Sequence, residues 1–234
     1  MRNKITKLDW IRITEEMHSN GYATIPELLT PDQCNEIIAL YEKEELFRKT
    51  VVMERHRFGK GEYKYFDYPL PQIVQELRAS LYTCLSPIAN GWMKALKLDV
   101  QFPMSLHGLQ AQCYGNNQKK PTPLLLKYGK GGFNTLHQDL YGAIYFPIQT
   151  VFFLTQPEVD FTGGEFVLTQ QTPRAQSKAI VLHPKKGDML IFATNFRPVK
   201  GVKGYYRANM RHGVSEVQSG NRRTLGIIFH DAIS

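Results

Sequence analysis

The sequence is poor in cysteine, lacks any long apolar run, and has fewer acidic than basic residues. Cys34, Cys84 and Cys113 are far apart and odd in number, which favours reduced thiols and a cytoplasmic location over a disulfide framework. No apolar run reaches the roughly 18 residues of a membrane span, and the N-terminal segment lacks the apolar region of a secretory signal. With 29 Lys and Arg against 21 Asp and Glu, the composition favours an anionic partner such as nucleic acid.

The first hundred residues have helical patterns. Thr30-Pro31-Asp32-Gln33 predicts a capped helix start, because a Thr cap, a Pro at the first position and a Gln three residues after the cap belong together. A second helix is expected from Pro71 to about Leu85, interrupted at Pro87, with a further helical stretch to about Leu96. The aromatic and basic segment Arg48 to Tyr68 between them is expected to be irregular or a hairpin.

The second half reads as β-structure. Short β-like runs alternate with Gly, Pro and Asn, and no long helix separates them. The expected strands are Leu124–Tyr128, Asn134–Gln138, Ile148–Leu154, Glu165–Thr169, Ala179–His183, Met189–Ala193, Gly213–Val217 and Thr224–His230. This pattern predicts a mainly β fold with α, a sandwich or jelly roll, in one compact domain. Residues 1–105 would form a helical support region and residues 106–234 the catalytic core.

A possible metal centre begins at His137-Gln138-Asp139. Side chains two residues apart on a strand share a face, so His137 and Asp139 point the same way. A third ligand is expected from a later strand, and His212 begins one. Two His and one carboxylate on one face suit Fe(II) and leave positions open for other ligands. Arg222, ten residues after His212, could pair bidentately with a carboxylate of a bound diacid.

These residues resemble, in order and spacing, the Fe(II)- and 2-oxoglutarate-dependent oxygenases. The resemblance covers roughly residues 124 to 231. It rests on His137-x-Asp139, Gly163-Gly164-Glu165, Gly187-Asp188 with Phe192, His212 and Arg222. The segment from His212 to Arg222 is similar to the prolyl hydroxylases, and the segment from Tyr128 to Asp139 to the AlkB nucleic-acid dealkylases. The whole chain also resembles a bacterial family assigned to the oxidation of damaged DNA.

The resemblance implies a double-stranded β-helix with N-terminal supporting helices and iron at one open end. It implies His137, Asp139 and His212 as iron ligands, with dioxygen as cosubstrate. Arg222 would bind the distal carboxylate of 2-oxoglutarate. Tyr128 matches a position whose hydroxyl often bonds that carboxylate, and Thr224 shares the face of Arg222. Arg223 is the rival of Arg222, and only one of these adjacent strand residues can enter the pocket.

The substrate class stays open between three alternatives. Nucleic acid is favoured by two basic clusters, one in 48–64 interleaved with aromatic rings and one in 197–223, because cations and stacking rings suit a single strand or a flipped base. The segment from His212 to Arg222 favours hydroxylation of a peptide, protein or amino acid. A non-catalytic sensor of 2-oxoglutarate or iron is the third alternative. Candidate substrate residues are Gln138, Tyr141, Asn209, Arg211, Tyr63, Tyr65 and Arg57.

Overall fold

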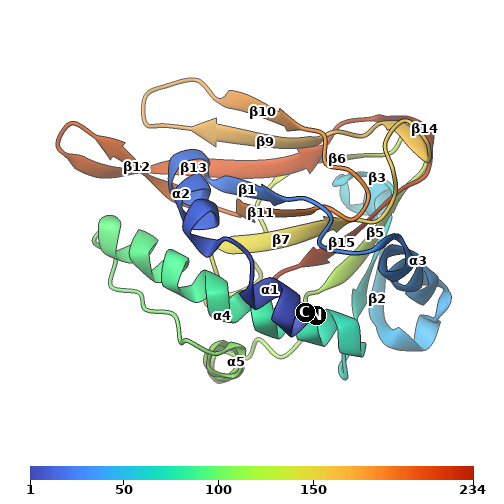
Figure 1. The fold of residues 1–234 in the computed structure, drawn as a ribbon, viewed down its shortest axis with the longest axis horizontal. Helices are drawn as coiled ribbons and strands as arrows, with labels where there is room; N and C mark the ends of the chain where they lie inside the picture. The colour runs from blue at the N-terminus through green and yellow to red at the C-terminus, as the bar shows by residue number, and fades with distance from the viewer.

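Two antiparallel β-sheets face each other in the computed structural model, which describes residues 1–234 (Figure 1). The larger sheet has seven strands and includes the last strand of the chain at its centre. In spatial order its strands are β1 (Tyr22–Ile25), β11 (Met189–Ala193), β7 (Ile148–Phe153), β15 (Arg222–Ile227), β5 (Leu124–Tyr128), β4 (Glu62–Phe66) and β2 (Phe47–Val52).

The smaller sheet covers one face of the larger sheet and carries two of the expected metal ligands. In spatial order it contains β10 (Lys178–Leu182), β9 (Phe166–Gln171), β13 (Gly204–Val214), β6 (Phe133–His137) and β3 (Gly59–Lys60). The strand β12 (Phe196–Gly201) pairs with β13, and together they form a hairpin that extends beyond the body of the molecule (Figure 1). A short pair, β8 (Phe161–Gly163) and β14 (Val217–Gly220), lies at the other end. The mainly β jelly-roll fold is therefore confirmed.

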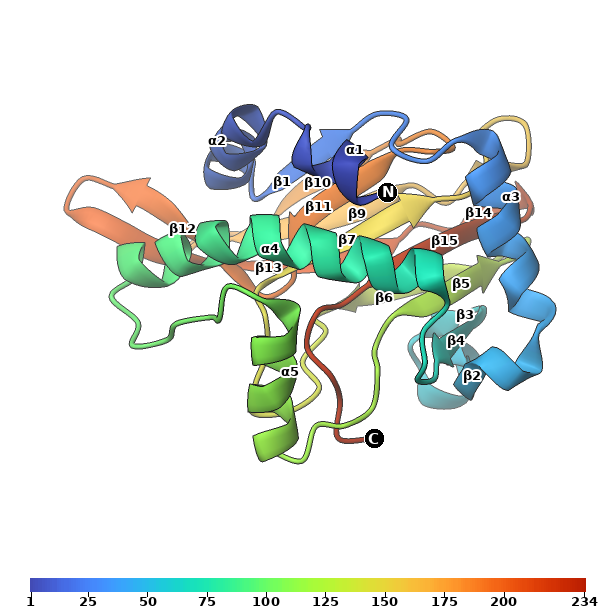
Figure 2. The same cartoon turned by 60° about the horizontal axis from the view of Figure 1, so that its bottom comes forward.

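Helices cover the other face of the larger sheet (Figure 2). They are α1 (Arg2–Thr6), α2 (Trp10–Asn20), α3 (Pro31–Ala39), α4 (Gln72–Ala95) and α5 (Leu106–Gly115), with short 3-10 turns η1 (Leu40–Glu42), η2 (Glu44–Leu46) and η3 (Met53–His56). A core of 38 buried residues joins α4 and its neighbours to this face. The predicted capping box of α3 is present, since Thr30 and Gln33 bond each other's backbone N–H. None of these helices is long and apolar enough to cross a membrane.

Two expectations about the elements were wrong, and one helix was missed. Helix α4 runs without interruption through Pro87, because its buried stripe, including Leu81, Ile88 and Trp92, outweighs the roughly 3 kcal/mol that an interior proline costs. Helix α5 was not expected at all, although its buried residues Leu106, Leu109 and Cys113 recur on one helix face. The strand bearing His212 begins at Gly204, well before the predicted start.

The N-terminal region also contributes strands to both sheets. β1 pairs with β11, and β4 pairs with β5, so the helical part is joined to the β-core through the backbone. The expected hairpin within 48–68 is confirmed as β2 and β4. Its connection, residues 53–61, includes β3 and pairs with β6 of the smaller sheet. This segment therefore closes the gap between the two sheets on the side of the metal ligands.

Candidate metal centre and carboxylate pocket

Three side chains meet at the open end of the two sheets. His137 ends β6, and its register partner across the sheet is His212 on β13, so the two imidazole rings lie 4.2 Å apart. Asp139 follows two residues later, and one ligand atom from each of the three residues lies within 4.8 Å of the others. His212 and Asp139 are buried, whereas His137 is partly exposed. The three donors can therefore hold one ion from one side and leave its other side facing the cavity.

The ligands are oriented before any ion binds. His137 Nδ1 lies 2.8 Å from the Thr135 carbonyl oxygen, which fixes the proton on Nδ1 and leaves Nε2 free for a metal. Burial, reinforced by the charge of His137, lowers the pKa of His212, so its imidazole is neutral. Burial alone would raise the pKa of Asp139, but His137 and the hydrogen bonds around the carboxylate lower it overall. A carboxylate beside the neutral imidazole of His212 suits the binding of a divalent ion.

Each oxygen of the Asp139 carboxylate also accepts a hydrogen bond. The Tyr141 hydroxyl donates to Oδ1 over 2.7 Å, and the Gln149 amide donates to Oδ2 over 2.9 Å. Gln149 is buried on β7, and its Nε2 also lies 3.1 Å from His212 Nε2, while its Oε1 has no partner. Sequence reasoning missed Gln149. The available signal was an amide side chain within a mostly apolar strand, because burial of an amide is unfavourable unless it has a specific contact.

A second polar feature lies at the closed end of the same cavity. Arg222 is 2 % exposed on β15, and its guanidinium lies 5.6 Å from the Tyr128 ring and 5.5 Å from the Phe153 ring. Its Nε and Nη2 have no hydrogen-bond partner, and neither does the Tyr128 hydroxyl. Burial lowers the pKa of Arg222 to about 10 and raises that of Tyr128 to about 12. Arg222 is thus a buried cation at neutral pH with donors available to a carboxylate.

The Gly163-Gly164 turn is required by this arrangement. Both glycines have positive φ, and a Cβ on Gly164 would lie 2.9 Å from Arg222 Cδ. A Cβ on Gly163 would lie 2.4 Å from the Glu216 carbonyl oxygen. Only residues without side chains fit between β8 and the stem of Arg222. The turn therefore shapes the end of the pocket that holds the guanidinium.

One cavity of about 220 Å³ connects the Arg222 end with the three metal ligands. Of the residues that the sequence suggested, Tyr63, Tyr65, Gln138, Tyr141, Tyr128 and Thr224 line it. Arg57, Asn209 and Arg211 do not line it and are exposed, the latter two on the face of β13 opposite His212. Arg223 also lies outside the cavity, with its guanidinium 5.2 Å from the Tyr41 ring. The amide of Gln138 donates to Asn195 and Met210, so it ties β6 to its neighbours.

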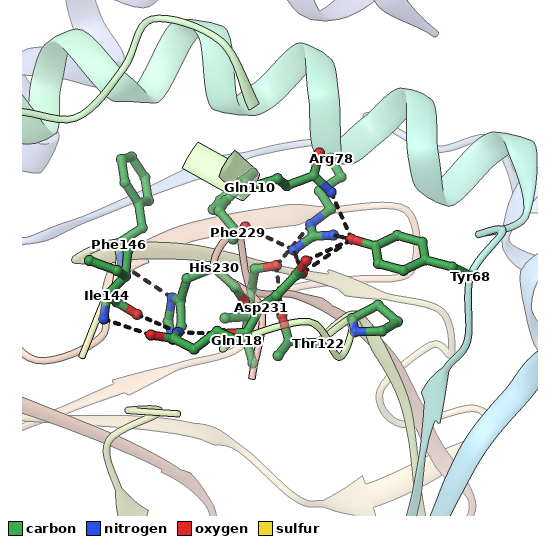
Figure 3. A network of polar contacts seen from close by, with 12 residues as sticks. Tyr68, Arg78, Gln110, Gln118, Thr122, Ile144, Phe146, Phe229, His230 and Asp231 are labelled. Atoms are coloured by element: carbon green, nitrogen blue, oxygen red, sulfur yellow. Dashed lines mark hydrogen bonds and ion pairs between the residues drawn. The ribbon is translucent and has the colours of Figure 1, made fainter. Parts of the chain in front are cut away.

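The segment that follows Asp139 is held by a buried polar network (Figure 3). Gln118 accepts from the backbone N–H of Ile144 and donates to the carbonyls of Ile144 and Asp231. His230 Nδ1 accepts from the backbone N–H of Phe146. Both contacts come from elements far away in the sequence, so the chain between Asp139 and β7 is fixed at several points. Tyr141, whose hydroxyl holds Asp139, lies within this segment.

Comparison with known proteins places these features in a family. Residues 61–232 match the family described as "Oxygenase, catalysing oxidative methylation of damaged DNA". Two uncharacterised proteins from strains of Mycobacterium tuberculosis are 43 % identical to the chain over 167 residues. This match covers 71 % of the chain and 72 % of each relative.

Solved structures with the same fold are much more distant in sequence. A prolyl-4-hydroxylase of Pseudomonas putida superposes with a TM-score of 0.59 at 12 % identity, covering 95 % of this chain and 98 % of that one. A 2OG-Fe(II) oxygenase family oxidoreductase of Burkholderia pseudomallei gives 0.55 at 15 % identity, covering 97 % and 94 %. A prolyl hydroxylase of Trichoplax adhaerens, in complex with a hypoxia inducible factor peptide fragment, gives 0.55 at 12 % identity, covering 98 % and 91 %. At such identities the likeness concerns the fold, which is the double-stranded β-helix.

Proposed function

The chain belongs to this family of oxygenases and has the fold of the Fe(II)- and 2-oxoglutarate-dependent enzymes, and we propose for it a metal site, a cosubstrate site and a substrate class. We propose that His137, Asp139 and His212 hold Fe(II). Arg222 binds the distal carboxylate of 2-oxoglutarate, and the enzyme hydroxylates a C–H bond of a damaged nucleic-acid base. The oxidation of a base-attached alkyl group would release it.

One observation carries the assignment of the cosubstrate. Arg222 is buried, charged and without a partner for two of its nitrogens, and it lines the same cavity as three metal-type ligands. An unpaired buried charge is strongly unfavourable, so an anion is expected to occupy the space beside it. A diacid with one carboxylate at Arg222 and its other end at the three ligands would pair with the buried cation and with the metal. The donor set therefore fits Fe(II) together with 2-oxoglutarate.

The protein's own groups then have separate tasks. When bound, Fe(II) with 2-oxoglutarate supplies an oxidation in which dioxygen is consumed and 2-oxoglutarate becomes succinate and carbon dioxide. Arg222 donates two hydrogen bonds to the distal carboxylate, and the Tyr128 hydroxyl adds a third. Thr224 offers its hydroxyl from the same face of β15. The apolar wall of Leu126, Val151 and Phe166 excludes water from the chain of the diacid.

Nucleic acid is the substrate class that the surface supports best. The family description names damaged DNA, the chain has a net charge of +8, and exposed basic residues of the 53–60 segment lie beside the cavity.

The peptide bound to the Trichoplax adhaerens enzyme favours the second candidate, hydroxylation of a peptide. A sensor without turnover is the third. Succinate formation separates the sensor from the two enzymes, because a sensor binds 2-oxoglutarate without consuming it.

The decisive experiment follows succinate and substrate mass together. Purified protein with Fe(II), 2-oxoglutarate and oxygen is incubated with methylated oligonucleotides or with proline-containing peptides, and products are identified by mass shift. We expect a mass change only on the oligonucleotide. His137→Ala, Asp139→Ala and His212→Ala should each abolish succinate formation and weaken binding of Co(II) as a spectroscopic probe, since each removes one of three protein ligands. Wild-type turnover in any of these variants would disprove the ligand set.

A further inference from the structure

An exposed aromatic ring stands at the rim of the cavity beside the metal ligands. Phe58 lines the cavity, yet 46 % of the residue is exposed. Its ring stacks on that of His56, with centroids 5.4 Å apart and the planes 22° from parallel. The Phe58 carbonyl oxygen accepts hydrogen bonds from both the backbone N–H and the hydroxyl of Thr135, each at 2.9 Å. Thr135 lies two residues before His137, so the backbone of Phe58 is anchored next to the metal centre.

The two tyrosines of the cavity that the sequence suggested as stacking rings are less exposed than Phe58. Tyr65 is 7 % exposed, its hydroxyl lies 2.9 Å from that of Tyr141, and the guanidinium of Arg48 covers its ring at 4.7 Å. Tyr63 is half-buried and packs edge-on against Tyr65 at 5.3 Å. The sequence suggested Tyr63 and Tyr65 as rings that stack on the substrate. In the structure they form the cavity wall, and Phe58 is the ring that presents a face to solvent.

Basic side chains flank this ring without acidic partners. Arg55, Arg57 and Lys60 are exposed, and none of them takes part in an ion pair. Lys60 Nζ lies over the turn at Gly131, where a Cβ would approach it to 2.9 Å. The acid in the segment, Glu54, accepts from the backbone N–H of Gly61. Three exposed cations without ion pairs and a stacked aromatic pair therefore lie within six residues of the chain.

We propose that Phe58, supported by His56, is the platform on which a base of a single nucleic-acid strand stacks at the rim of the cavity. In the same complex Arg55, Arg57 and Lys60 contact the adjoining phosphates. This inference rests on the proposed nucleic-acid substrate and names the residues that bind it. Aromatic faces bind bases of any identity, because every base has a π-face, and cations along the backbone add the salt-dependent part of the affinity. The platform thus presents the strand to the metal centre without reading its sequence.

The test compares two fluorescein-labelled strands of equal length, one of thymidines and one abasic, by anisotropy with the full-length protein. Phe58→Ala should weaken binding of the thymidine strand by about 5- to 150-fold at an unchanged salt slope, the range that loss of one stacked base implies. Binding of the abasic strand should not change, and Phe58→Trp should retain wild-type affinity. Arg57→Gln should instead lower the salt slope by roughly 0.7 on both strands.

Tyr205→Ala is the matched control, because Tyr205 is 52 % exposed but lies on the hairpin at the end of the molecule remote from β3 (Figure 1). It should bind both strands as the wild type does. If Phe58→Ala binds thymidines normally, or loses affinity equally for the abasic strand, the platform is refuted while the nucleic-acid substrate stands. If the wild-type protein binds neither strand at about 50 mM salt, the nucleic-acid substrate itself is refuted, and the platform with it.

Discussion

Two buried arginines lie on opposite faces of the larger sheet, and their surroundings differ completely. Arg78, on α4, is fully buried, and each of its three guanidinium nitrogens donates a hydrogen bond. Its Nη2 is 2.6 Å from the buried carboxylate of Asp231 (Figure 3). Arg222, on β15, is almost equally buried but forms no ion pair, and two of its nitrogens have no partner.

The difference indicates a structural role for Arg78 and supports the binding role proposed for Arg222. Burial tends to lower the pKa of both guanidinium groups, but Asp231 reverses this effect at Arg78, whose pKa is raised. At Arg222 the attraction of Tyr128 and Glu165 does not outweigh burial, and its pKa is lowered to about 10. A buried ion pair that is fully hydrogen-bonded belongs to the folded structure, whereas an uncompensated buried cation is expected to gain its counterion from a ligand. Substitutions of Arg78 should therefore change the stability of the fold, whereas substitutions of Arg222 should change ligand binding.

The largest effect is expected on stability at Arg78. Arg78→Met leaves Asp231 buried without its cation and should lower the free energy of unfolding by about 3–5 kcal/mol, measured by urea denaturation. The double variant Arg78→Met with Asp231→Leu removes both charges and should recover much of this loss, because an apolar pair needs no compensation. A single variant as stable as the wild type would show that the pair contributes nothing to the fold.

The next effect is on the pH dependence of stability, and it comes from His230, which lies near Arg78. Burial, with the nearby cation of Arg78, holds the pKa of His230 at about 3 in the folded protein, below the ordinary value of 6.5. Below pH 6.5 the unfolded chain therefore binds a proton that the folded protein does not. Stability should fall as the pH drops from about 6.5 towards 3, by up to about 1.4 kcal/mol per pH unit.

His230→Gln keeps an acceptor for the Phe146 N–H but cannot titrate, so its urea-unfolding free energy should depend less on pH over this range. His107→Gln, at an exposed position of α5, is the matched control and should follow the wild type. If His230→Gln and the wild type lose stability in parallel between pH 7 and about pH 5, the burial of a neutral His230 is not responsible for acid sensitivity.

The position of Arg222 in the cavity could be predicted from the sequence, whereas the ion pair of Arg78 could not. Arg222, Tyr128 and the three metal ligands follow from strand alternation and from a spacing shared with a known family, because both are local along the chain. Arg78 and Asp231 are 153 residues apart, and no periodic pattern links them. For the same reason β1 was missed, since a four-residue strand is defined by its distant partner β11. Helix α4 continues through Pro87 because of tertiary packing, and the local preference of proline gives no information about that packing.

At Arg222 the expected effect is on 2-oxoglutarate and not on folding. Arg222→Met should raise the apparent dissociation constant for 2-oxoglutarate by about 10- to 150-fold, corresponding to 1.5–3 kcal/mol for lost charge-assisted bonds. The free energy of unfolding of the ligand-free variant should equal or exceed that of the wild type, since an unpaired buried charge has been removed. Arg223→Met, outside the cavity, should change the constant much less. The reverse order would mean that Arg223 binds the carboxylate.

The smallest effect is expected at two tyrosine hydroxyls, one of which is hydrogen-bonded like Arg78 and the other without a partner like Arg222. Tyr68 Oη contacts Arg78, Asp231 and Gln110, whereas Tyr128 Oη has no partner. Tyr68→Phe should therefore destabilise the fold by about 1–3 kcal/mol and leave 2-oxoglutarate binding unchanged. Tyr128→Phe should leave stability unchanged or raise it, and should weaken 2-oxoglutarate binding by about 2- to 12-fold, the value of one hydrogen bond. Urea denaturation and calorimetric titration on both variants measure the two quantities. If both variants lost stability and neither lost affinity, the Tyr128 hydroxyl would be structural, and Arg222 would hold the carboxylate without it.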